Sequence, residues 1–350
     1  MSVLVTGATG LVGAQVCREL LADGQDVAAM VRRRTPPHGT RPVVAHLDVP
    51  ADLERAMAGH DTVFHCAAIY AYGRAREEEL EAVNVTGTRD VLRAAASAGV
   101  RRVVVTSSSV TCGSSGGRAA RDEAHAPSEE FAPAYFGSKV RQEQTAFETG
   151  AELGVEVVVA CPTVVLGGPA TRLVPSNAIL LRYLLDPTRS TYPGGCNVVA
   201  LDDVARGHVL VAERGTPGER YLLGGENVSW RLLHTLLAEL AGVPGPFAEV
   251  STTMAVLAAA ASELAASVTS TEPLTTRDEA LTIGRYYWYD DRRARALGYT
   301  SGSARQAVAG SLSWLLAGDD LPRWVRESLR PAPEVRAARR LVPRRTVDPG

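Results

Sequence analysis

The first strand and the glycine-rich loop that follows it constrain the fold of this chain more than any other stretch. Residues 2–6 are a short apolar run, and Gly7-Ala8-Thr9-Gly10-Leu11-Val12-Gly13 follows them directly. An amphipathic stretch then continues to Gly24, where a helix is expected to end. A strand, a glycine loop and a helix in this order are the context in which a dinucleotide binds to an α/β sheet.

Each glycine of this loop is expected to do something different. Gly7 permits the tight turn, Gly10 lets the backbone approach a pyrophosphate, and Gly13 lets the helix pack closely on the strand. The helix N-terminus then offers free N–H groups and a partial positive charge to the phosphates. The cofactor-binding residues predicted in the loop are Gly7, Thr9, Gly10, Leu11, Val12 and Gly13.

The end of the second predicted strand, residues 26–31, indicates which dinucleotide is bound. An acid at this position would bind the ribose hydroxyls and repel a 2′-phosphate. The strand instead runs into Arg32-Arg33-Arg34, and Arg32 is well placed to pair with a phosphate. A solvated turn is the alternative interpretation in an arginine-rich chain. Because the acid is missing as well, we predict NADP(H), with NAD(H) as the second choice.

Strands and helices alternate along the rest of the first two thirds of the chain. Further strands are predicted at residues 43–47, 61–65, 102–105, 155–160 and 196–200, and helices at residues 77–98, 135–153 and 203–213. This alternation predicts an α/β fold with a doubly wound parallel sheet, the Rossmann arrangement.

A smaller C-terminal substrate-binding lobe is expected beside that sheet. The Rossmann domain is predicted to cover residues 1–166 and to be completed by about residues 190–228. The lobe would comprise residues 167–189 and 229–318, with helices at residues 177–185, 230–240 and 255–266. Residues 319–350 are rich in arginine and proline. A helical run is expected at residues 324–329, and the rest is expected to be a loosely attached or disordered tail.

Loops that follow the predicted strands supply candidate contacts to cofactor and substrate. Asp48-Val49 stands where the adenine ring would be covered, and the small pair Ala67-Ala68 would let the backbone pass close to a flat cofactor. Tyr70 and Tyr72 follow the same strand end and are candidates to contact substrate. His65 ends that strand, and we interpret it as structural.

Tyr135 and Lys139 form the strongest candidate for a catalytic pair. They are four residues apart at the start of a predicted helix, so their side chains lie on one face. Lys139 is the only lysine among 37 Lys and Arg residues. A lysine is a compact point charge, unlike the planar arginine fork, so this position is singled out. A nearby ammonium is expected to lower the pKa of the phenol, which is about 10 when unperturbed.

Composition excludes several other kinds of protein. The net charge is −2, so no overall field favours nucleic acid or an anionic membrane. The five cysteines are widely spaced without a CxxC pair, which argues against disulfides and against a zinc site, and we predict no metal. No basic leader precedes the first strand, and the apolar run at residues 254–266 is too short to span a membrane. We expect a soluble, cytoplasmic protein.

Taken together, these motifs resemble those of the extended short-chain dehydrogenase/reductases. The resemblance rests on TGxxGxxG at Thr6–Gly13, YxxxK at Tyr135–Lys139 and the hydroxyl run Thr106-Ser107-Ser108-Ser109 between them. Further matches are Asn84–Thr88, Cys161-Pro162-Thr163, Leu201–Ala205 and Gly218–Asn227. The last is similar to the dihydroflavonol-reductase-like branch of the NAD-dependent epimerase/dehydratase family. The resemblance covers about residues 1–318.

The resemblance implies a role for each matching residue. Tyr135 would be the general acid for carbonyl reduction, and Lys139 would tune it and bind the nicotinamide ribose. Ser108 would hold and polarise the substrate oxygen, with Ser107 and Ser109 as alternatives because the register is uncertain by about one residue. Asn84 would belong to a proton relay behind Lys139. The further cofactor contacts implied are Thr106, Pro162 and Val164.

Two departures from the family pattern narrow the chemistry. Sugar-nucleotide 4,6-dehydratases have an acid pair after the catalytic Thr or Ser, where this chain has Ser109-Val110, so dehydration is excluded. The residue before Pro162 is often Arg in the family but is Cys161 here.

The aromatic run at residues 286–289 could line a substrate, although packing of the lobe is the favoured interpretation.

The resulting hypothesis is an NADPH-dependent reductase of a ketone or aldehyde on a small molecule, with a natural-product intermediate of specialised metabolism as the expected substrate. An NAD-dependent nucleotide-sugar epimerase, which uses the same Tyr and Lys, is the alternative. A non-catalytic NADP-sensing protein on the same fold is a third hypothesis, although such proteins typically lose the Tyr/Lys pair. The family also implies a homodimer formed through the helices that begin near Glu77 and Tyr135.

Overall fold

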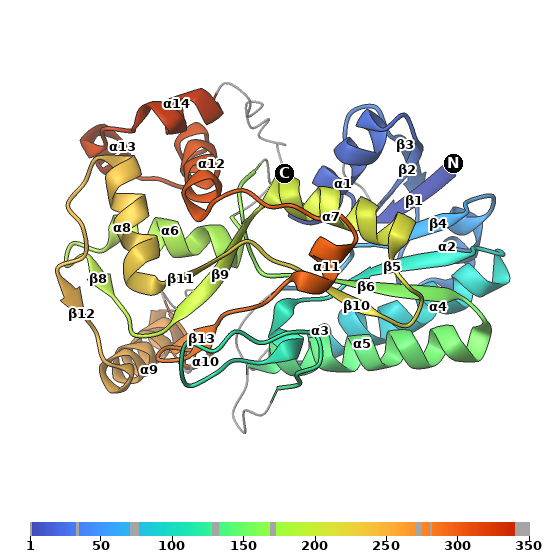
Figure 1. Ribbon diagram of the computed structural model, residues 1–350, viewed down its shortest axis with the longest axis horizontal. Helices are drawn as coiled ribbons and strands as arrows, with labels where there is room; N and C mark the ends of the chain where they lie inside the picture. Colours follow the sequence, from blue (N-terminus) through green and yellow to red (C-terminus); the bar gives the residue numbers. More distant parts are fainter. Residues whose placement is uncertain are drawn as a thin grey trace.

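A seven-stranded parallel sheet forms the larger of two lobes in the computed structural model (Figure 1). The structure describes residues 2–32, 35–70, 77–127, 133–168, 173–269, 275–280 and 282–339. The strand order is β10-β6-β5-β4-β1-β2-β3, and every neighbouring pair is parallel. The strands are β1 (Ser2–Thr6), β2 (Asp26–Val31), β3 (Arg41–Val44), β4 (Thr62–His65), β5 (Arg102–Thr106), β6 (Glu156–Pro162) and β10 (Arg220–Leu223).

Helices cover both faces of this sheet, as the alternating sequence pattern predicts. On one face α1 (Leu11–Ala22) packs beside α7 (Leu201–Arg214) over Val3 and Val5 of β1. On the other face lie α2 (Pro50–Met57), α4 (Gly87–Ser97) and α5 (Ala134–Leu153). Successive strand residues point to opposite faces, so a strand buried on both sides is apolar throughout. The predicted doubly wound α/β fold is confirmed.

Two predicted elements differ locally from the structure. The third strand was expected at residues 43–47 but spans Arg41–Val44, at the edge of the sheet, where only β2 pairs with it. The helix expected at residues 77–98 is divided into α3 (Glu77–Leu80), a π-helical turn at Glu81–Thr86 and α4. Such wide turns are rare and are found mostly as local bulges, often at functional sites. The turn contains Asn84, a poor helix former.

The smaller lobe contains a second sheet with the order β11-β9-β13 and with β7 paired to β9. Its strands are β7 (Val164–Leu166), β9 (Gly195–Ala200), β11 (Glu226–Ser229) and β13 (Tyr286–Tyr287), and a separate pair is β8 (Ser190–Thr191) with β12 (Ala248–Glu249). Its helices are α6 (Pro175–Leu185), α8 (Trp230–Ala241), α9 (Thr252–Thr269), α10 (Arg277–Ala280) and α12 (Ala304–Ala317). Trp314 and leucines of α6, α8 and α12 form its core. The short helix α11 (Arg292–Ala296) instead packs against β10 of the large sheet.

The C-terminal segment is better ordered than its composition predicts. Residues 319–339 form α13 (Arg323–Ser328) and α14 (Pro333–Arg339), which pack on the smaller lobe beside α12. The helical run expected at residues 324–329 is present as α13, whereas residues 330–339 are not the loosely attached tail that was expected. The reason is that the few apolar side chains of residues 319–339 are placed to enter the core of the lobe: Leu321, Val325, Leu329 and Val335. Residues 340–350 lie outside the described part of the chain.

The aromatic run at residues 286–289 ties the loop after β5 to the smaller lobe. Tyr286 and Ser115 exchange backbone hydrogen bonds of 2.9 and 3.0 Å. Tyr289 donates its hydroxyl to Gly113 O at 3.0 Å, and Trp288 donates its indole N–H to Val228 O at 3.1 Å. These contacts agree with the packing role. In the described residues, no helix is both long enough and apolar enough to cross a membrane.

Candidate active site

The glycine loop has the shape that a pyrophosphate requires. Gly7 has a φ of 65°, and a Cβ there would lie 2.6 Å from the backbone nitrogen of Ala67. A Cβ on Gly13 would lie 2.4 Å from Gly7 O, so α1 packs directly against the turn. No side chain caps α1 at Gly10, which leaves the first N–H groups of the helix for a ligand. The described residues therefore fit a bound dinucleotide.

His65 and Thr6 fix the strand ends beside this loop. The Thr6 hydroxyl lies 2.8 Å from His65 Nδ1 and accepts a hydrogen bond from Ala67 N at 3.3 Å. Burial, with a smaller effect of Lys139, lowers the pKa of His65 to about 3. The imidazole is therefore neutral and held between the hydroxyls of Thr6 and Thr88, the second lying 3.0 Å from His65 Nε2, which agrees with its interpretation as structural.

Residues expected around the adenosine lie at the carboxyl edge of the sheet. Arg32 is exposed at the end of β2 and makes no hydrogen bond or ion pair with any described residue. Asp48 and Val49 are exposed just before α2, after the neighbouring strand β3. Arg33 and Arg34 lie outside the described residues. The free guanidinium and the exposed loop thus border the region where parallel sheets bind ligands.

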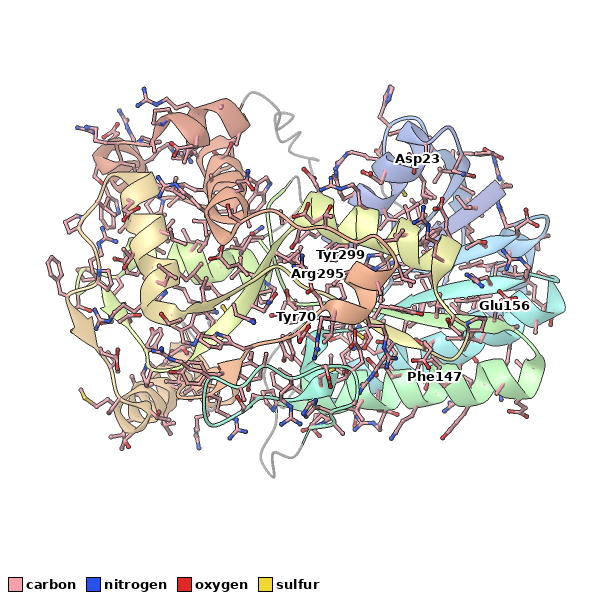
Figure 2. The ribbon with its side chains drawn as sticks, in the orientation of Figure 1. Asp23, Tyr70, Phe147, Glu156, Arg295 and Tyr299 are labelled. Carbon is pink, nitrogen blue, oxygen red and sulfur yellow. The ribbon has the colours of Figure 1, made fainter. Side chains whose placement is uncertain are left out.

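Tyr135 lies in the first turn of α5, which begins at Ala134, and its side chain is almost entirely buried. The side chain of Ser108 is hydrogen-bonded to its phenol. The ring of Tyr70 lies 4.7 Å from the ring of Tyr135, measured between centroids. Tyr70 stands in the middle of the molecule, between the two lobes (Figure 2). Tyr72, the other predicted substrate contact, is outside the described residues.

The three serines of the hydroxyl run have different surroundings in the structure. Ser107 donates its hydroxyl to the carboxylate of Glu143, and Ser109 is buried in the short turn that follows. Only Ser108 has a described contact with the phenol, and its hydroxyl also accepts a hydrogen bond from Val110 N at 3.4 Å. Among the three serines, Ser108 is therefore the one that lies at the Tyr135 phenol.

Lys139 is buried beneath Tyr135 and held by the protein. Its ammonium donates to Thr106 O at 3.0 Å and to Gln142 Oε1 at 2.8 Å, and it lies 6.0 Å from the centre of the Tyr135 ring. Burial lowers the pKa of Lys139 to about 8, although the charge of Glu143 opposes this. The ammonium is thus the major form at neutral pH.

The pKa of Tyr135 differs in direction from the expectation based on its spacing to Lys139. Burial raises the pKa of this phenol, the neighbouring Tyr70 raises it further, and only the Ser108 hydrogen bond lowers it. The loss of water around the oxygen outweighs the favourable contacts because an anion is costly to bury. The phenol is therefore held in its protonated form.

Asn84 is placed to hold two segments of the site together. Its amide nitrogen donates to Ile69 O and to Ser138 Oγ, both at 3.1 Å, and its Oδ1 accepts from Ile69 N at 2.8 Å. Ser138 in turn donates to Tyr135 O at 2.8 Å. The side chain thus joins α5 to the segment that bears Tyr70. It does not reach Lys139 directly, so the relay role implied by the resemblance stays a prediction.

Pro162 and Val164 lie where the two lobes meet. Pro162 ends β6 beside Leu223 of β10, and Val164 begins β7 of the smaller sheet. Between them, Thr163 donates its hydroxyl to Asn197 Oδ1 at 2.8 Å. Thr106, at the end of β5, contributes the carbonyl that accepts from Lys139, and its hydroxyl lies 3.0 Å from His208 Nε2.

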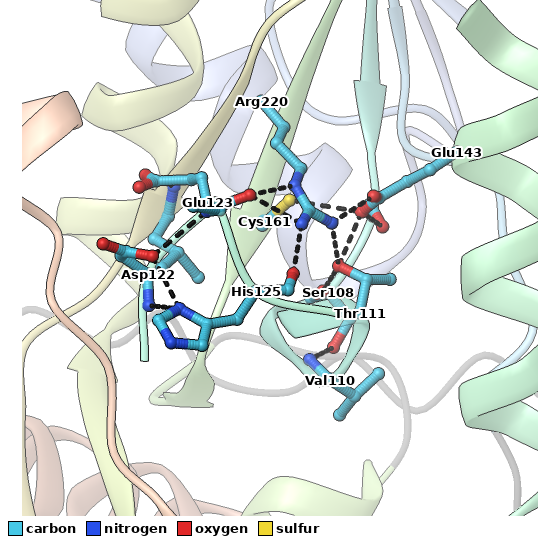
Figure 3. A network of polar contacts seen from close by, with 12 residues as sticks. Ser108, Val110, Thr111, Asp122, Glu123, His125, Glu143, Cys161 and Arg220 are labelled. Carbon is cyan, nitrogen blue, oxygen red and sulfur yellow. Dashed lines mark hydrogen bonds and ion pairs between the residues drawn. The ribbon is translucent and has the colours of Figure 1, made fainter. Parts of the chain in front are cut away.

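A buried ion pair that sequence reasoning did not single out braces the loop with Ser108 (Figure 3). Glu143, four residues after Lys139, pairs with Arg220 at 2.9 Å and accepts from Thr111 at 2.8 Å, as well as from Ser107. Arg220 also donates to the carbonyl oxygens of Glu123 and His125. The only sequence signal was that Glu143 shares a helix face with Lys139.

Arg220 also lies close to Cys161, the position at which this chain departs from the family pattern. In β6 and β10, Cys161 pairs with Leu222, so Arg220 lies two residues away on the adjacent strand. The Cys161 thiol lies 3.4 Å from Glu143, next to the guanidinium that neutralises this acid. A cation from β10 is therefore available at this place, where the family often has an arginine on β6.

The comparisons with known proteins agree with this arrangement. The family model "NAD dependent epimerase/dehydratase family" matches residues 3–224. A Synechocystis sp. protein, provisionally named dihydroflavonol 4-reductase, is 33% identical over 321 residues, covering 89% of this chain and 93% of its own. The 4-hydroxy-2-methyl-3-oxo-4-farnesyl-3,4-dihydroquinoline-1-oxide ketoreductase of Stigmatella aurantiaca is 31% identical over 322 residues, covering 85% and 92%.

Solved structures show the same fold over nearly the whole chain. The crystal structure of gox2253 has a TM-score of 0.79 and 30% identity, covering 92% of this chain and 99% of its own. MoeE5 in complex with UDP-glucuronic acid and NAD has a TM-score of 0.70 and 25% identity, covering 90% and 99%. Motifs, fold and relatives agree, and the chain belongs to the NAD-dependent epimerase/dehydratase family of extended short-chain dehydrogenase/reductases, as an NAD(P)-dependent enzyme acting on C–OH and C=O groups.

Proposed function

We propose that this protein is an NADPH-dependent reductase of a ketone or aldehyde on a small molecule, with Tyr135 as the proton donor. The observation that carries the proposal is the protonated, buried phenol of Tyr135 in hydrogen-bond contact with Ser108. A general acid must hold its proton until the transition state, and burial keeps it there. The ketoreductase of Stigmatella aurantiaca among the relatives supports a ketone on a natural-product intermediate as the substrate.

The proposed mechanism uses three side chains around one oxygen atom. Bound NADPH would supply the hydride. The Ser108 hydroxyl donates a hydrogen bond to the carbonyl oxygen and stabilises the negative charge that develops there. Tyr135 then transfers its proton to that oxygen, so that the carbonyl becomes an alcohol. Lys139 stabilises the phenolate that remains and would hold the ribose of a bound dinucleotide.

The preference for NADPH is assigned to Arg32. A 2′-phosphate beside this exposed guanidinium would gain a charge-assisted hydrogen bond, and no acid follows β2 in the sequence to repel it. We expect Arg32→Ser to raise the Kd for NADPH about tenfold, equivalent to about 1.4 kcal/mol, and to leave the Kd for NADH nearly unchanged. Fluorescence titration of the two reduced dinucleotides measures both constants.

The matched control for this variant is Arg231→Ser, which removes an exposed arginine of α8 in the smaller lobe. It should leave both dissociation constants as in the wild type. An unchanged preference in Arg32→Ser, or a wild type that binds NADH as tightly as NADPH, would remove the basis for the NADP(H) assignment.

The nucleotide-sugar epimerase is retained as the second candidate because MoeE5, in complex with UDP-glucuronic acid and NAD, shares the fold over 90% of this chain. An epimerase would return its hydride to the substrate and show no net use of a dinucleotide. The reductase is tested by incubating the protein with NADPH and a panel of ketones and aldehydes. We expect NADPH to be consumed in proportion to the alcohol formed with at least one member of the panel.

A further inference from the structure

Gln142 is the side chain that most directly holds the Lys139 ammonium. It lies three residues after Lys139 on α5 and is completely buried. Its Oε1 accepts a hydrogen bond from Lys139 Nζ at 2.8 Å, and its Nε2 donates to Thr88 Oγ1 at 2.9 Å. The carboxamide therefore joins the lysine to a residue of α4, on the neighbouring helix.

The orientation of this carboxamide is fixed from both sides. Thr88 donates its single hydroxyl proton to Asn84 O at 2.7 Å, so its oxygen acts as an acceptor towards its other two partners, Gln142 Nε2 and His65 Nε2 at 3.0 Å. An ammonium carries three donors and no acceptor, so the group that faces Lys139 must be the amide oxygen. The two requirements agree, and the reversed amide would place donor against donor at the lysine.

The ammonium of Lys139 has more hydrogen-bond donors than it has acceptors among the described residues. The ammonium of Lys139 has three N–H groups, and the protein takes two of them, one at Thr106 O and one at Gln142 Oε1. No other described residue accepts a hydrogen bond from this nitrogen. The two acceptors fix the direction of the third N–H, which is left for a ligand of the site.

We propose that Gln142 is a positioning residue of this enzyme, which orients the Lys139 ammonium so that one N–H group is presented to the ribose of the bound dinucleotide. The inference rests on the proposed function only in the assignment of Lys139 to the ribose. Gln142 does not touch cofactor or substrate in this account. It acts through the lysine.

The electrostatic surroundings of Lys139 make this inference testable by pH. Burial already lowers the pKa of the ammonium to about 8, and the neutral amide of Gln142 supplies one of its two hydrogen-bond acceptors. The titratable groups that face the lysine are Glu143 and Tyr135 on α5, His65 at the end of β4, Cys66 after it, and Cys161 on β6. Of these, Glu143 favours the ammonium most, and Cys161 and Cys66 favour it less.

Two substitutions of Gln142 should therefore move the titration in opposite directions. In Gln142→Met the buried ammonium loses an acceptor, so it deprotonates at lower pH. In Gln142→Glu it gains a carboxylate partner, so it stays charged to higher pH. We expect the pH at which NADPH binding weakens to fall by about one unit in the first variant and to rise by about one unit in the second. Fluorescence titration of NADPH over the neutral to alkaline range measures this midpoint.

Gln144→Met is the matched control, because Gln144 is exposed on the same helix and the chemical change is identical. Its midpoint should equal that of the wild type. Midpoints that stay unchanged in both Gln142 variants, or that move in the same direction, would overturn the inference. A purely structural role predicts either of these results. If Gln142→Met does not fold, the direction of the shift in Gln142→Glu decides.

The same titration separates this inference from the proposed function. The role of Gln142 is supported if NADPH binding by the wild type weakens at alkaline pH and the two Gln142 variants move this midpoint in opposite directions. This holds even if no carbonyl compound is reduced. Such a result would overturn the reductase alone. If the protein reduces a carbonyl compound but the pH midpoint of NADPH binding is the same in the wild type and the Gln142 variants, only the positioning role is overturned.

Discussion

Replacing Tyr135 by phenylalanine should nearly abolish carbonyl reduction, lowering kcat by at least about 10²- to 10⁴-fold. The substitution removes the hydroxyl that is hydrogen-bonded to Ser108, and keeps the ring that packs against Tyr70 and Phe136. The dissociation constant of NADPH should change little, because the glycine loop and Arg32 are untouched. Steady-state rates of NADPH oxidation and a binding titration measure the two effects separately.

The control for this prediction is Tyr183→Phe, which deletes a hydroxyl bonded to Pro244 O in the smaller lobe. It tests whether the loss of any tyrosine hydroxyl lowers activity simply because it destabilises the folded protein. It should keep kcat within a factor of about two. Turnover in Tyr135→Phe close to that of the wild type would show that another group donates the proton.

Breaking the buried ion pair between Glu143 and Arg220 is expected to have the largest effect on stability. Arg220→Met leaves the carboxylate of Glu143 buried without its cation and removes the hydrogen bonds to the carbonyl oxygens of Glu123 and His125. Removal of one partner of such a pair typically costs about 3–5 kcal/mol. The free energy of unfolding, measured in urea, should fall by about this amount.

A second substitution shows whether the uncompensated charge is the cause. In the double variant Arg220→Met with Glu143→Gln, the neutral amide needs no cation, so the loss should be smaller than the sum of the two single losses. Arg323→Met, which removes an exposed arginine paired with Glu327, should leave the unfolding free energy within experimental error. Strictly additive single losses, or a loss in Arg220→Met no larger than in Arg323→Met, would contradict the account of this pair.

The parts of the fold that the sequence predicts well are those determined by local spacing. The strand, the glycine loop and the first helix follow one another within 22 residues, and β1 and β2 have the predicted bounds. The Tyr135 helix is likewise fixed by its own periodicity and by the glycine that ends it at position 154. Each of these elements is determined by residues next to one another in the chain.

The features that the sequence did not predict depend on distant residues. Glu143 meets Arg220 across 77 positions, and nothing in either neighbourhood indicates the contact. The helices at residues 319–339 pack because four apolar side chains reach a core built by α8 and α12, which composition cannot show. The raised pKa of Tyr135 depends on burial, which is a property of the folded chain. The orientation of the Gln142 carboxamide depends on its hydrogen bond to Thr88, a residue that lies far away in the sequence.

The most direct test of the central claim follows the hydride itself. NADPH carrying deuterium at the transferable position of its nicotinamide is incubated with the enzyme and a carbonyl substrate identified from the panel. We expect one deuterium on the carbinol carbon of each alcohol formed and one NADP⁺ for each product. Protein that retains tightly bound NAD⁺ after purification, consumes no NADPH and interconverts two sugar nucleotides without deuterium uptake would contradict the account.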